Sequence, residues 1–373
     1  MQKVIVGMSG GVDSSVAAYL LKERGYEVGG VSFLMWEAES AGSPACCSLK
    51  TTDEASKTAS SLGIHHITID ARNDFMEKVV EPFIKAYQSG LTPNPCILCN
   101  RFIKFPYLIR EADKRGAEYI STGHYAKVER EDSSGQGLKG AGHFSDLIPR
   151  SPVRLKKGID PKKDQSYVLY GLRQEELARL ILPLGYYGKS DVRKMAKDLD
   201  LSAAERPESQ EICFVEEKSY LAFIERLSSA RTEPGPIVDP NGKMIGTHKG
   251  IYGYTIGQRK GLGISSPRPL YVVDTDIRKN TVYVGPRDAA EKIEFFVDEV
   301  NWIAPPSKTL FFRASVKVRS TMKEEPATIF PDASFESVRV VFDEPQWAPA
   351  PGQSAVFYEG DAVIGGGVIR KPV

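Results

Sequence analysis

A strand–loop–helix turn near the start of the chain constrains the fold more than any other feature. The apolar residues 4–6 predict a buried strand, and apolar residues at helical spacing run from Val16 to a stop at Gly25. Between them lies the segment SGGVDSS, residues 9–15. Its glycines allow a tight turn, and the N–H groups that open the helix favour a phosphate. A Walker loop is excluded because the Gly-Lys-Ser/Thr ending is missing. The alternative is a tight turn without a ligand.

Predicted strands and helices alternate through the first half of the chain. Strands are expected at 27–33, 66–69 and 119–121, and helices at 52–62, 73–88 and 102–115. This order predicts a parallel sheet with helices on both faces. Ligands bind such sheets beyond the carboxyl ends of the strands. That edge should therefore gather the opening loop, Phe33 and the segment TGHY at 122–125, where His124 is a candidate site residue.

Composition limits the choice of partners and compartment. The 373 residues are enough for two or three domains. Lys and Arg number 49 against 48 Asp and Glu, so a nucleic acid would have to meet a local basic face. Five cysteines, an odd number, favour reduced thiols in a cytoplasm over a disulfide scaffold. No run of 18 apolar residues predicts a membrane span, and a strand from residue 4 leaves no room for a signal peptide.

Cysteines form the second informative group. In LTPNPCILCN, residues 91–100, the prolines are expected to keep the backbone out of a helix. Cys96 and Cys99 then have a spacing that suits a redox pair, half a metal site, or a nucleophile with a neighbour. A nearby helix start, together with Arg101 and Lys104, should stabilise a thiolate at Cys99. Cys213 has a polar, charged flank, which favours a functional thiol in an exposed loop. The adjacent thiols at 46 and 47 are either surface thiols or zinc partners of the C-x-x-C pair.

The second half of the chain changes character. Short strands and Gly-Pro turns replace helices from about residue 234, and residues 129–152 form a predicted surface insertion. Apolar residues from 312 to 318 alternate with Arg313, Ser315, Lys317 and Arg319. This alternation predicts a barrel strand whose outer face is a basic stripe that suits structured RNA. The expected domains are 1–212, 213–282 and 283–373.

Seven segments, taken together and in order, resemble the tRNA-specific 2-thiouridylase family (MnmA/TrmU) of the ATP-pyrophosphatase (PP-loop) superfamily. They are residues 7–15, 92–105, 122–125, 163–167, 209–214, 257–263 and 351–357. The resemblance implies an α/β fold with a parallel-sheet PP-loop domain, a small β-rich central domain and a C-terminal antiparallel β-barrel. It also implies a cytoplasmic enzyme that adenylates the wobble uridine of tRNAs for Lys, Glu and Gln with ATP and replaces O2 by sulfur. The sulfur would come from a persulfide donor, a cysteine desulfurase or a sulfur-relay protein.

The resemblance also assigns residues. Those implied to bind ATP are Gly7, Met8, Ser9, Gly10, Gly11, Val12, Asp13, Ser14, Phe33 and Gly123. Those implied to contact tRNA are Asn94, Pro95, Cys96, Lys163, Asp164, Gln165, Arg319 and Ser320, with His124 and Gln353 in support. Cys213 would carry the persulfide, and Cys99 would be the nucleophile that frees its sulfur. Because a triphosphate needs a cation, we expect Asp13 to organise Mg²⁺.

One position departs from the family pattern. Many members have Asp where this chain has Cys96, and a thiol replaces a carboxylate poorly in acid–base work. Cys96, Cys99 and Cys213 could instead hold a [4Fe-4S] cluster with one open iron that delivers sulfide. The persulfide and cluster routes both remain open at this point. More distant alternatives are another ATP-pyrophosphatase synthetase and a non-catalytic RNA-binding protein.

Overall fold

The first domain is built on a five-stranded parallel sheet. The structure, a computed structural model, describes residues 1–37, 48–130, 153–201, 203–204, 212–215, 220–228, 233–307 and 309–372. The strand order is β3 (His65–Asp70), β2 (Glu27–Leu34), β1 (Lys3–Gly7), β4 (Tyr119–Ser121) and β7 (Leu180–Ile181). The predicted parallel sheet is confirmed.

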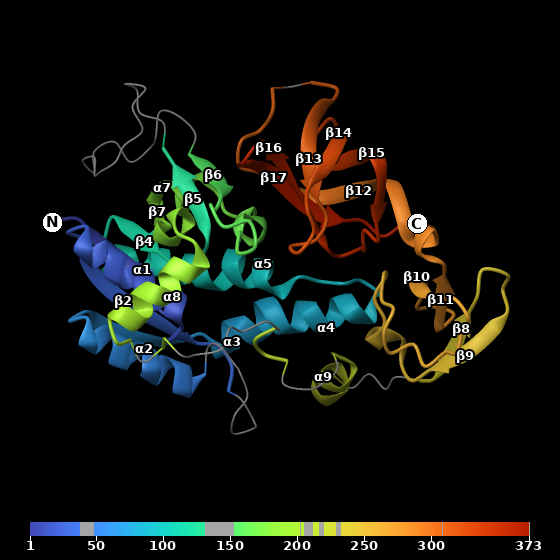
Figure 1. Cartoon of the computed structure of the whole chain (residues 1–373), viewed down its shortest axis with the longest axis horizontal. Helices are drawn as coiled ribbons and strands as arrows, with labels where there is room; N and C mark the ends of the chain where they lie inside the picture. Colours follow the sequence, from blue (N-terminus) through green and yellow to red (C-terminus); the bar gives the residue numbers. More distant parts are fainter. Residues whose placement is uncertain are drawn as a thin grey trace.

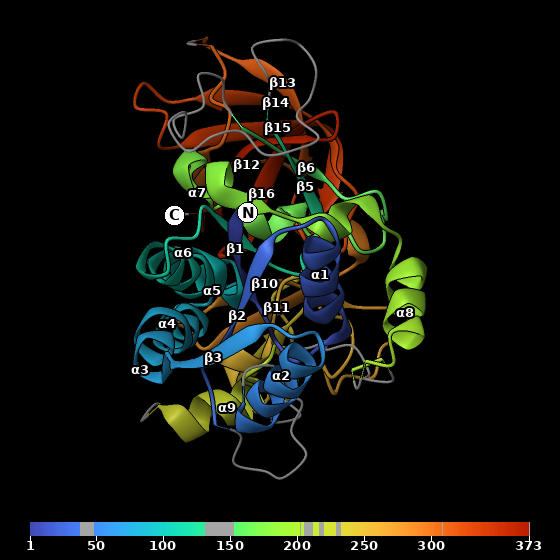
Figure 2. The same ribbon diagram turned by 90° about the vertical axis from the view of Figure 1, so that its left-hand side faces the viewer.

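Successive side chains of β1 point to opposite faces of this sheet, and helices pack on both faces. Val4 and Val6 pack against α1 (Val12–Glu23) and α2 (Leu49–Ser61), while Ile5 belongs to the core beneath α6 (Phe105–Lys114). Figure 2 shows α1 and α6 on opposite sides of the strands. The described helices do not cover the edge of the sheet at the carboxyl ends of β1, β2 and β4, which is where ligands bind in folds of this kind.

Two long helical segments cover the second face. The first is α3 (Arg72–Phe75), a π-helical turn (Met76–Val80) and α4 (Glu81–Gln88), in agreement with the predicted helix at 73–88. The second is α5 (Pro95–Cys99), a π-helical turn (Asn100–Lys104) and α6. This segment was expected to begin only at residue 102, after a non-helical stretch.

That expectation is wrong because of where the prolines fall. Pro95 occupies the first helical position, where its missing N–H costs nothing and its fixed φ suits the helix. Asn94 caps the helix, since its Oδ1 accepts the Cys96 N–H at 3.2 Å. Cys96 and Cys99 therefore both lie on a helix.

The remaining elements that precede the central sheet are shorter. They are α7 (Gln174–Arg179), α8 (Lys189–Asp198), α9 (Tyr220–Leu227), β5 (Ala126–Glu129), β6 (Arg154–Lys157) and the 3₁₀ turns Ser166–Leu169 and Pro183–Tyr186. None of the helices among the described residues is long and apolar enough to cross a membrane.

The middle of the chain forms a small four-stranded sheet, as predicted. Its order is β10 (Tyr271–Asp276), β11 (Thr281–Gly285), β8 (Gly235–Val238) and β9 (Met244–His248), with 3₁₀ turns at Ile251–Gly253 and Arg287–Ala290. It has a separate core that includes Ile237, Val272 and Val282. In Figure 1 this sheet lies at the end of the molecule farthest from α1.

The C-terminal part is a closed antiparallel barrel, again as predicted. It comprises β12 (Glu291–Trp302), β13 (Phe312–Lys317), β14 (Glu325–Pro331), β15 (Val338–Trp347), β16 (Ser354–Glu359) and β17 (Ala362–Ile369). Pairing of β12 with β17 closes it, and Val316, Val340 and Phe357 lie in its core. The barrel is joined to the first domain because β6 pairs with β17 (Figure 1).

The predicted basic stripe on β13 is wrong. Lys317 is buried, and desolvation lowers its pKa. Arg313 is exposed but paired with Asp343 at 2.7 Å. Arg319 donates through Nη2 to the carbonyl oxygens of residues 256 and 348, both at 2.9 Å. Only the end of this face that carries Lys317 and Arg319 is covered, because the barrel packs there against the preceding domains. The alternation of residues along a strand does not predict such a contact.

Candidate nucleotide and thiol site

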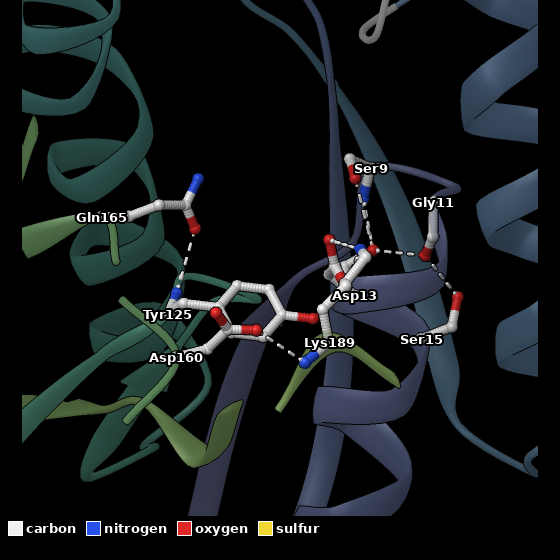
Figure 3. Close-up of polar contacts among 9 residues, drawn as sticks. Ser9, Gly11, Asp13, Ser15, Tyr125, Asp160, Gln165 and Lys189 are labelled. Atoms are coloured by element: carbon white, nitrogen blue, oxygen red, sulfur yellow. Dashed lines mark hydrogen bonds and ion pairs between the residues drawn. The ribbon is translucent and has the colours of Figure 1, made fainter. Parts of the chain in front are cut away.

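The phosphate loop between β1 and α1 is held in shape by its own hydroxyls. The Ser9 N–H donates to Ser14 Oγ at 3.1 Å, and the Ser14 and Ser15 hydroxyls donate to the Gly11 carbonyl at 3.2 and 2.9 Å (Figure 3). Gly10 has φ +72°, and a Cβ there would lie 2.4 Å from the Thr51 carbonyl oxygen. Glycine is thus required both by the turn and by the close approach of α2.

A pocket of about 200 Å³ opens over this loop. Most of the predicted ATP residues line it, namely Gly7, Met8, Ser9, Asp13, Ser14, Phe33 and Gly123, together with His124 and Gln165. Gly10, Gly11 and Val12 support the loop without lining the pocket, and Val12 packs in the core that α1 shares with α8. The structure adds lining residues that sequence reasoning did not assign to the nucleotide: Ser32, Thr51, Thr52, Lys104, Leu108 and Thr122.

Gly123 brings the loop after β4 against the start of α1. A Cβ at this position would lie 2.7 Å from the Ser14 nitrogen and 2.8 Å from the Asp13 carbonyl carbon. The next residue, His124, has Nδ1 2.7 Å from Thr122 Oγ1, and its ring stacks on Phe105. Two chain segments more than 100 residues apart thereby form one wall.

The neutral state of the buried His124 predicts that the stability of the fold decreases at acid pH. Burial, with a smaller contribution from the Lys104 ammonium, lowers the pKa of His124 from 6.5 to about 3. The unfolded chain therefore binds this proton below about pH 6.5 while the folded chain does not, and stability falls as the pH drops from 6.5 toward 3. At about pH 5.5 the loss from this one residue is about 1.4 kcal/mol.

We expect His124→Gln, which cannot take up the proton, to escape that loss. Urea unfolding at about pH 7.5 and 5.5 should show a smaller acid-induced drop in unfolding free energy for the variant than for the wild type, by about 1.4 kcal/mol. Equal drops would show that the folded protein does not hold His124 neutral.

Asp13 is already paired, which changes its expected role. Lys189 Nζ lies 2.7 Å from both carboxylate oxygens, and the Tyr125 hydroxyl donates to Oδ1 at 2.6 Å (Figure 3). Among the described residues, no three His, Cys, Asp or Glu side chains are grouped to hold a metal. The described residues around Asp13 therefore do not fit a Mg²⁺ ion held by protein ligands alone.

The described thiols differ in exposure. Cys96 is exposed, Cys213 is half-buried, and Cys99 is buried with its Sγ 3.8 Å from Met35 Sδ. None of the three is in a disulfide, and they are not grouped as a ligand set. This arrangement does not fit a [4Fe-4S] cluster. Cys46, Cys47 and the insertion at 131–152 lie outside the described residues.

Cys99 and Cys213 are nevertheless linked through neighbouring residues. Met35 contacts Cys99, and the next residue, Trp36, packs its ring 6.1 Å from that of Phe214, which follows Cys213. Phe214 is fully buried among further aromatic rings. Lys104, expected to stabilise a thiolate at Cys99, lines the pocket over the phosphate loop.

Several predicted tRNA residues serve to position loops. The Tyr125 N–H donates to Gln165 Oε1 at 3.0 Å, and Asp164 Oδ1 accepts N–H groups from residues 158 and 166. Gln353 Nε2 donates to the Thr92 carbonyl at 2.9 Å, so the barrel holds the segment that leads into Asn94. Of the remaining predicted residues, Pro95 is buried, Lys163 is half-buried and Ser320 is exposed, while Arg319 is bound to carbonyls as described above.

The fold and the pocket define a parallel-sheet α/β domain with a glycine-rich loop that suits a phosphate, followed by a small β-rich domain and a β-barrel. Family models agree: residues 2–217 match the tRNA methyl transferase HUP domain, 222–286 the tRNA methyl transferase PRC-barrel domain, and 292–369 the Aminomethyltransferase beta-barrel domain. Full-length relatives that are 42% and 46% identical show that the chain belongs to the tRNA-specific 2-thiouridylase (MnmA) family.

Relatives of similar length are tRNA-specific 2-thiouridylases. The chain is 46% identical to tRNA-specific 2-thiouridylase MnmA 2 of Thermoanaerobacter sp. (strain X514), over 99% of this chain and 98% of the relative. It is 42% identical to the MnmA of Clostridioides difficile (strain 630) over the same shares. A solved U34-tRNA thiolase NcsA from Methanococcus maripaludis, with its [4Fe-4S] cluster, shares 19% identity over 60% of this chain and 63% of that one, at a TM-score of 0.33. So weak a likeness supports no inference about this chain.

Proposed function

We propose that this chain is a tRNA sulfurtransferase that uses ATP to convert the wobble uridine of tRNA to 2-thiouridine. One structural observation supports the proposal in addition to family membership. Strand β2 and the helical segment that begins at Pro95 each contribute residues both to the nucleotide pocket and to the surroundings of a buried thiol. At the end of β2, Phe33 lines the pocket and Met35 contacts Cys99. On the helical segment from Pro95, Cys99 lies one turn before Lys104, which lines the pocket.

The first step is activation of the base. The uridine O2 attacks the α-phosphorus of ATP, the bond from that phosphorus to the bridging oxygen breaks, and pyrophosphate leaves. A poor leaving group thereby becomes AMP. The N–H groups at the start of α1 and the Lys104 ammonium are placed to hold the phosphates, and Mg²⁺ bound to them adds further charge neutralisation.

The second step transfers sulfur. The Cys99 thiolate attacks Cys213 Sγ, the S–S bond of the Cys213 persulfide breaks, and the outer sulfur leaves with the electron pair. That sulfur attacks C2 of the adenylated uridine and AMP departs. A Cys99–Cys213 disulfide remains, and a thiol reductant must return both residues to thiols before a donor reloads Cys213.

The two thiols of this transfer share one hydrophobic core, because Cys99 belongs to it and Cys213 packs against it. They are not joined in a disulfide, Met35 and Trp36 connect their surroundings, and we propose that Cys213 moves to reach Cys99. Movement is consistent with Cys213 being half-buried beside an anchored Phe214. Asn94 and Pro95, held by Gln353 through residue 92, are the residues that we propose to meet the target base, with Cys96 near the base but not required for the reaction.

Anaerobic preparation tests the sulfur route. We expect iron-free protein, supplied with ATP, tRNA and a small persulfide donor, to form 2-thiouridine, detected by mass spectrometry of digested tRNA. Cys96→Ala should keep most of this activity. Stoichiometric iron and acid-labile sulfide that are lost in Cys96→Ala and required for activity would instead establish the cluster route.

The same assay separates the proposal from other functions. Pyrophosphate release that depends on tRNA is expected. Release driven by another acceptor, without tRNA, would indicate a different ATP-pyrophosphatase synthetase, and tRNA binding without ATP turnover would indicate a non-catalytic RNA-binding protein. The proposed tRNAs are those for Lys, Glu and Gln, the proposed donor is a cysteine desulfurase or a sulfur-relay protein, and the proposed compartment is the cytoplasm.

A further inference from the structure

Lys189 is a cation from outside the phosphate loop that is paired with Asp13, a residue lining the pocket. It is the first residue of α8, far from Asp13 in sequence, and its side chain is only 12% exposed. Its Nζ bonds both oxygens of Asp13 at 2.7 Å and lies 5.5 Å from the centre of the Tyr125 ring. Its backbone N–H donates to Asp160 at 3.1 Å (Figure 3).

An unpaired Asp13 would oppose nucleotide binding. Its carboxylate lies in the first turn of α1 and lines the same pocket as the residues proposed to hold the phosphates. A negative charge within a few ångströms of a triphosphate repels it, the more strongly where water is partly excluded. The N-terminus of α1 attracts the phosphates. A positive charge beside Asp13 is needed so that its carboxylate can stay in the site without repelling them.

The aspartate also has a mechanical use. Its Oδ1 accepts the Tyr125 hydroxyl, and the Tyr125 backbone is joined to Gln165 through the Gln165 N–H at 2.9 Å and the Gln165 side chain at 3.0 Å. Asp13 therefore fastens the loop after β4 and the start of α8 to the phosphate loop.

We propose that Lys189 is a positioning residue of the nucleotide site: it neutralises Asp13, so that Asp13 can anchor Tyr125 and α8 beside the triphosphate without repelling it. The inference rests on the proposed use of ATP. It assigns to Asp13 an anchoring role in place of a metal-binding one, and it assigns Lys189 a role exerted through Asp13 and not by contact with substrate.

A double-substitution cycle tests this assignment. The readouts are ATP affinity without tRNA, and KM for ATP and kcat in tRNA-dependent pyrophosphate release. Lys189→Met should raise the dissociation constant and KM by about ten- to a hundredfold, with a smaller effect on kcat. Asp13→Asn, which keeps an oxygen for Tyr125, should leave KM near or below the wild-type value. The double variant should return KM to within about threefold of wild type, since the uncompensated charge is gone.

Two further variants make the result specific. Lys189→Arg should keep near-normal KM because it keeps the charge. Lys194→Met, an exposed lysine on the same helix, should match the wild type. If the double variant is as weak as Lys189→Met, then Lys189 contacts the nucleotide itself and the proposal is wrong. If Asp13→Asn alone abolishes ATP binding, then Asp13 is a ligand of the nucleotide or its cation, and the proposal is again wrong.

The binding readout keeps this proposal separable from the proposed function. A wild-type protein that binds ATP but forms no 2-thiouridine would refute the sulfur transfer, while the binding cycle would still decide the role of Lys189. A wild-type protein that does not bind ATP would overturn both.

Discussion

Replacing Cys213 with serine is expected to abolish 2-thiouridine formation while tRNA binding stays within a few fold of the wild type. A hydroxyl cannot carry a persulfide, and serine nearly preserves the volume of the side chain. Because the neighbouring Phe214 supplies the buried contacts, the local packing should survive the change. Thiolation would be measured by mass spectrometry of digested tRNA, and binding by filter retention of labelled tRNA.

Two companion variants sharpen this result. Cys99→Ser should also stop turnover, but after exposure to a persulfide donor its Cys213 should carry one additional sulfur, visible in the intact mass, since the attacking thiolate is missing. Cys96→Ser, at the exposed cysteine, is the matched control and should retain most thiolation. Normal thiolation by Cys213→Ser would refute the persulfide assignment.

Replacing Gly10 with alanine is expected to lower kcat/KM for ATP by roughly a hundredfold, the cost of misplacing binding groups by about an ångström. The positive φ of +72° strains any residue with a Cβ, and that Cβ would lie 2.4 Å from the Thr51 carbonyl oxygen. The clash can be relieved only by moving the loop or the start of α2, and both line the pocket. Pyrophosphate release at varied ATP concentration measures the effect.

Gly25 offers a matched control for this prediction. Its φ is +82°, but nothing lies within 4 Å of a Cβ there. Gly25→Ala should therefore cost about 1 kcal/mol of stability from backbone strain alone and leave KM for ATP unchanged. If both variants lose activity equally, strain and not the contact with α2 explains the loss; if neither does, the loop tolerates displacement and the preformed phosphate site is wrong.

Much of the architecture follows from short-range patterns. The apolar run at 4–6, the glycines of the phosphate loop and the stop at Gly25 predict β1, the turn and α1 where the structure has them. The alternation of strands and helices predicts the parallel sheet, and the Gly-Pro turns with short strands predict the β-rich second half. Periodicity and turn chemistry involve residues within a few positions of each other, so a single sequence carries them.

The sequence also located most of the nucleotide pocket, although for partly different reasons. Gly123 was expected beside the nucleotide, whereas the structure shows that it admits the start of α1. Asp13 was expected to serve a cation, but Lys189 already occupies its carboxylate. No local signal distinguishes Lys189 from the other lysines of α8, because its role exists only once α8 packs against α1.

By itself, the sequence predicted the order of the domains, the class of the phosphate loop and the thiols that are candidates for the reaction. Only the tertiary structure decided which charges are compensated and which thiols are exposed: the pairing of Asp13 with Lys189, the burial of Lys317 and Cys99, and the use of Arg319 and Gln353 to join domains. The physical reason is that desolvation and ion pairing depend on the atoms brought into contact by distant segments. Local propensity depends only on neighbours along the chain.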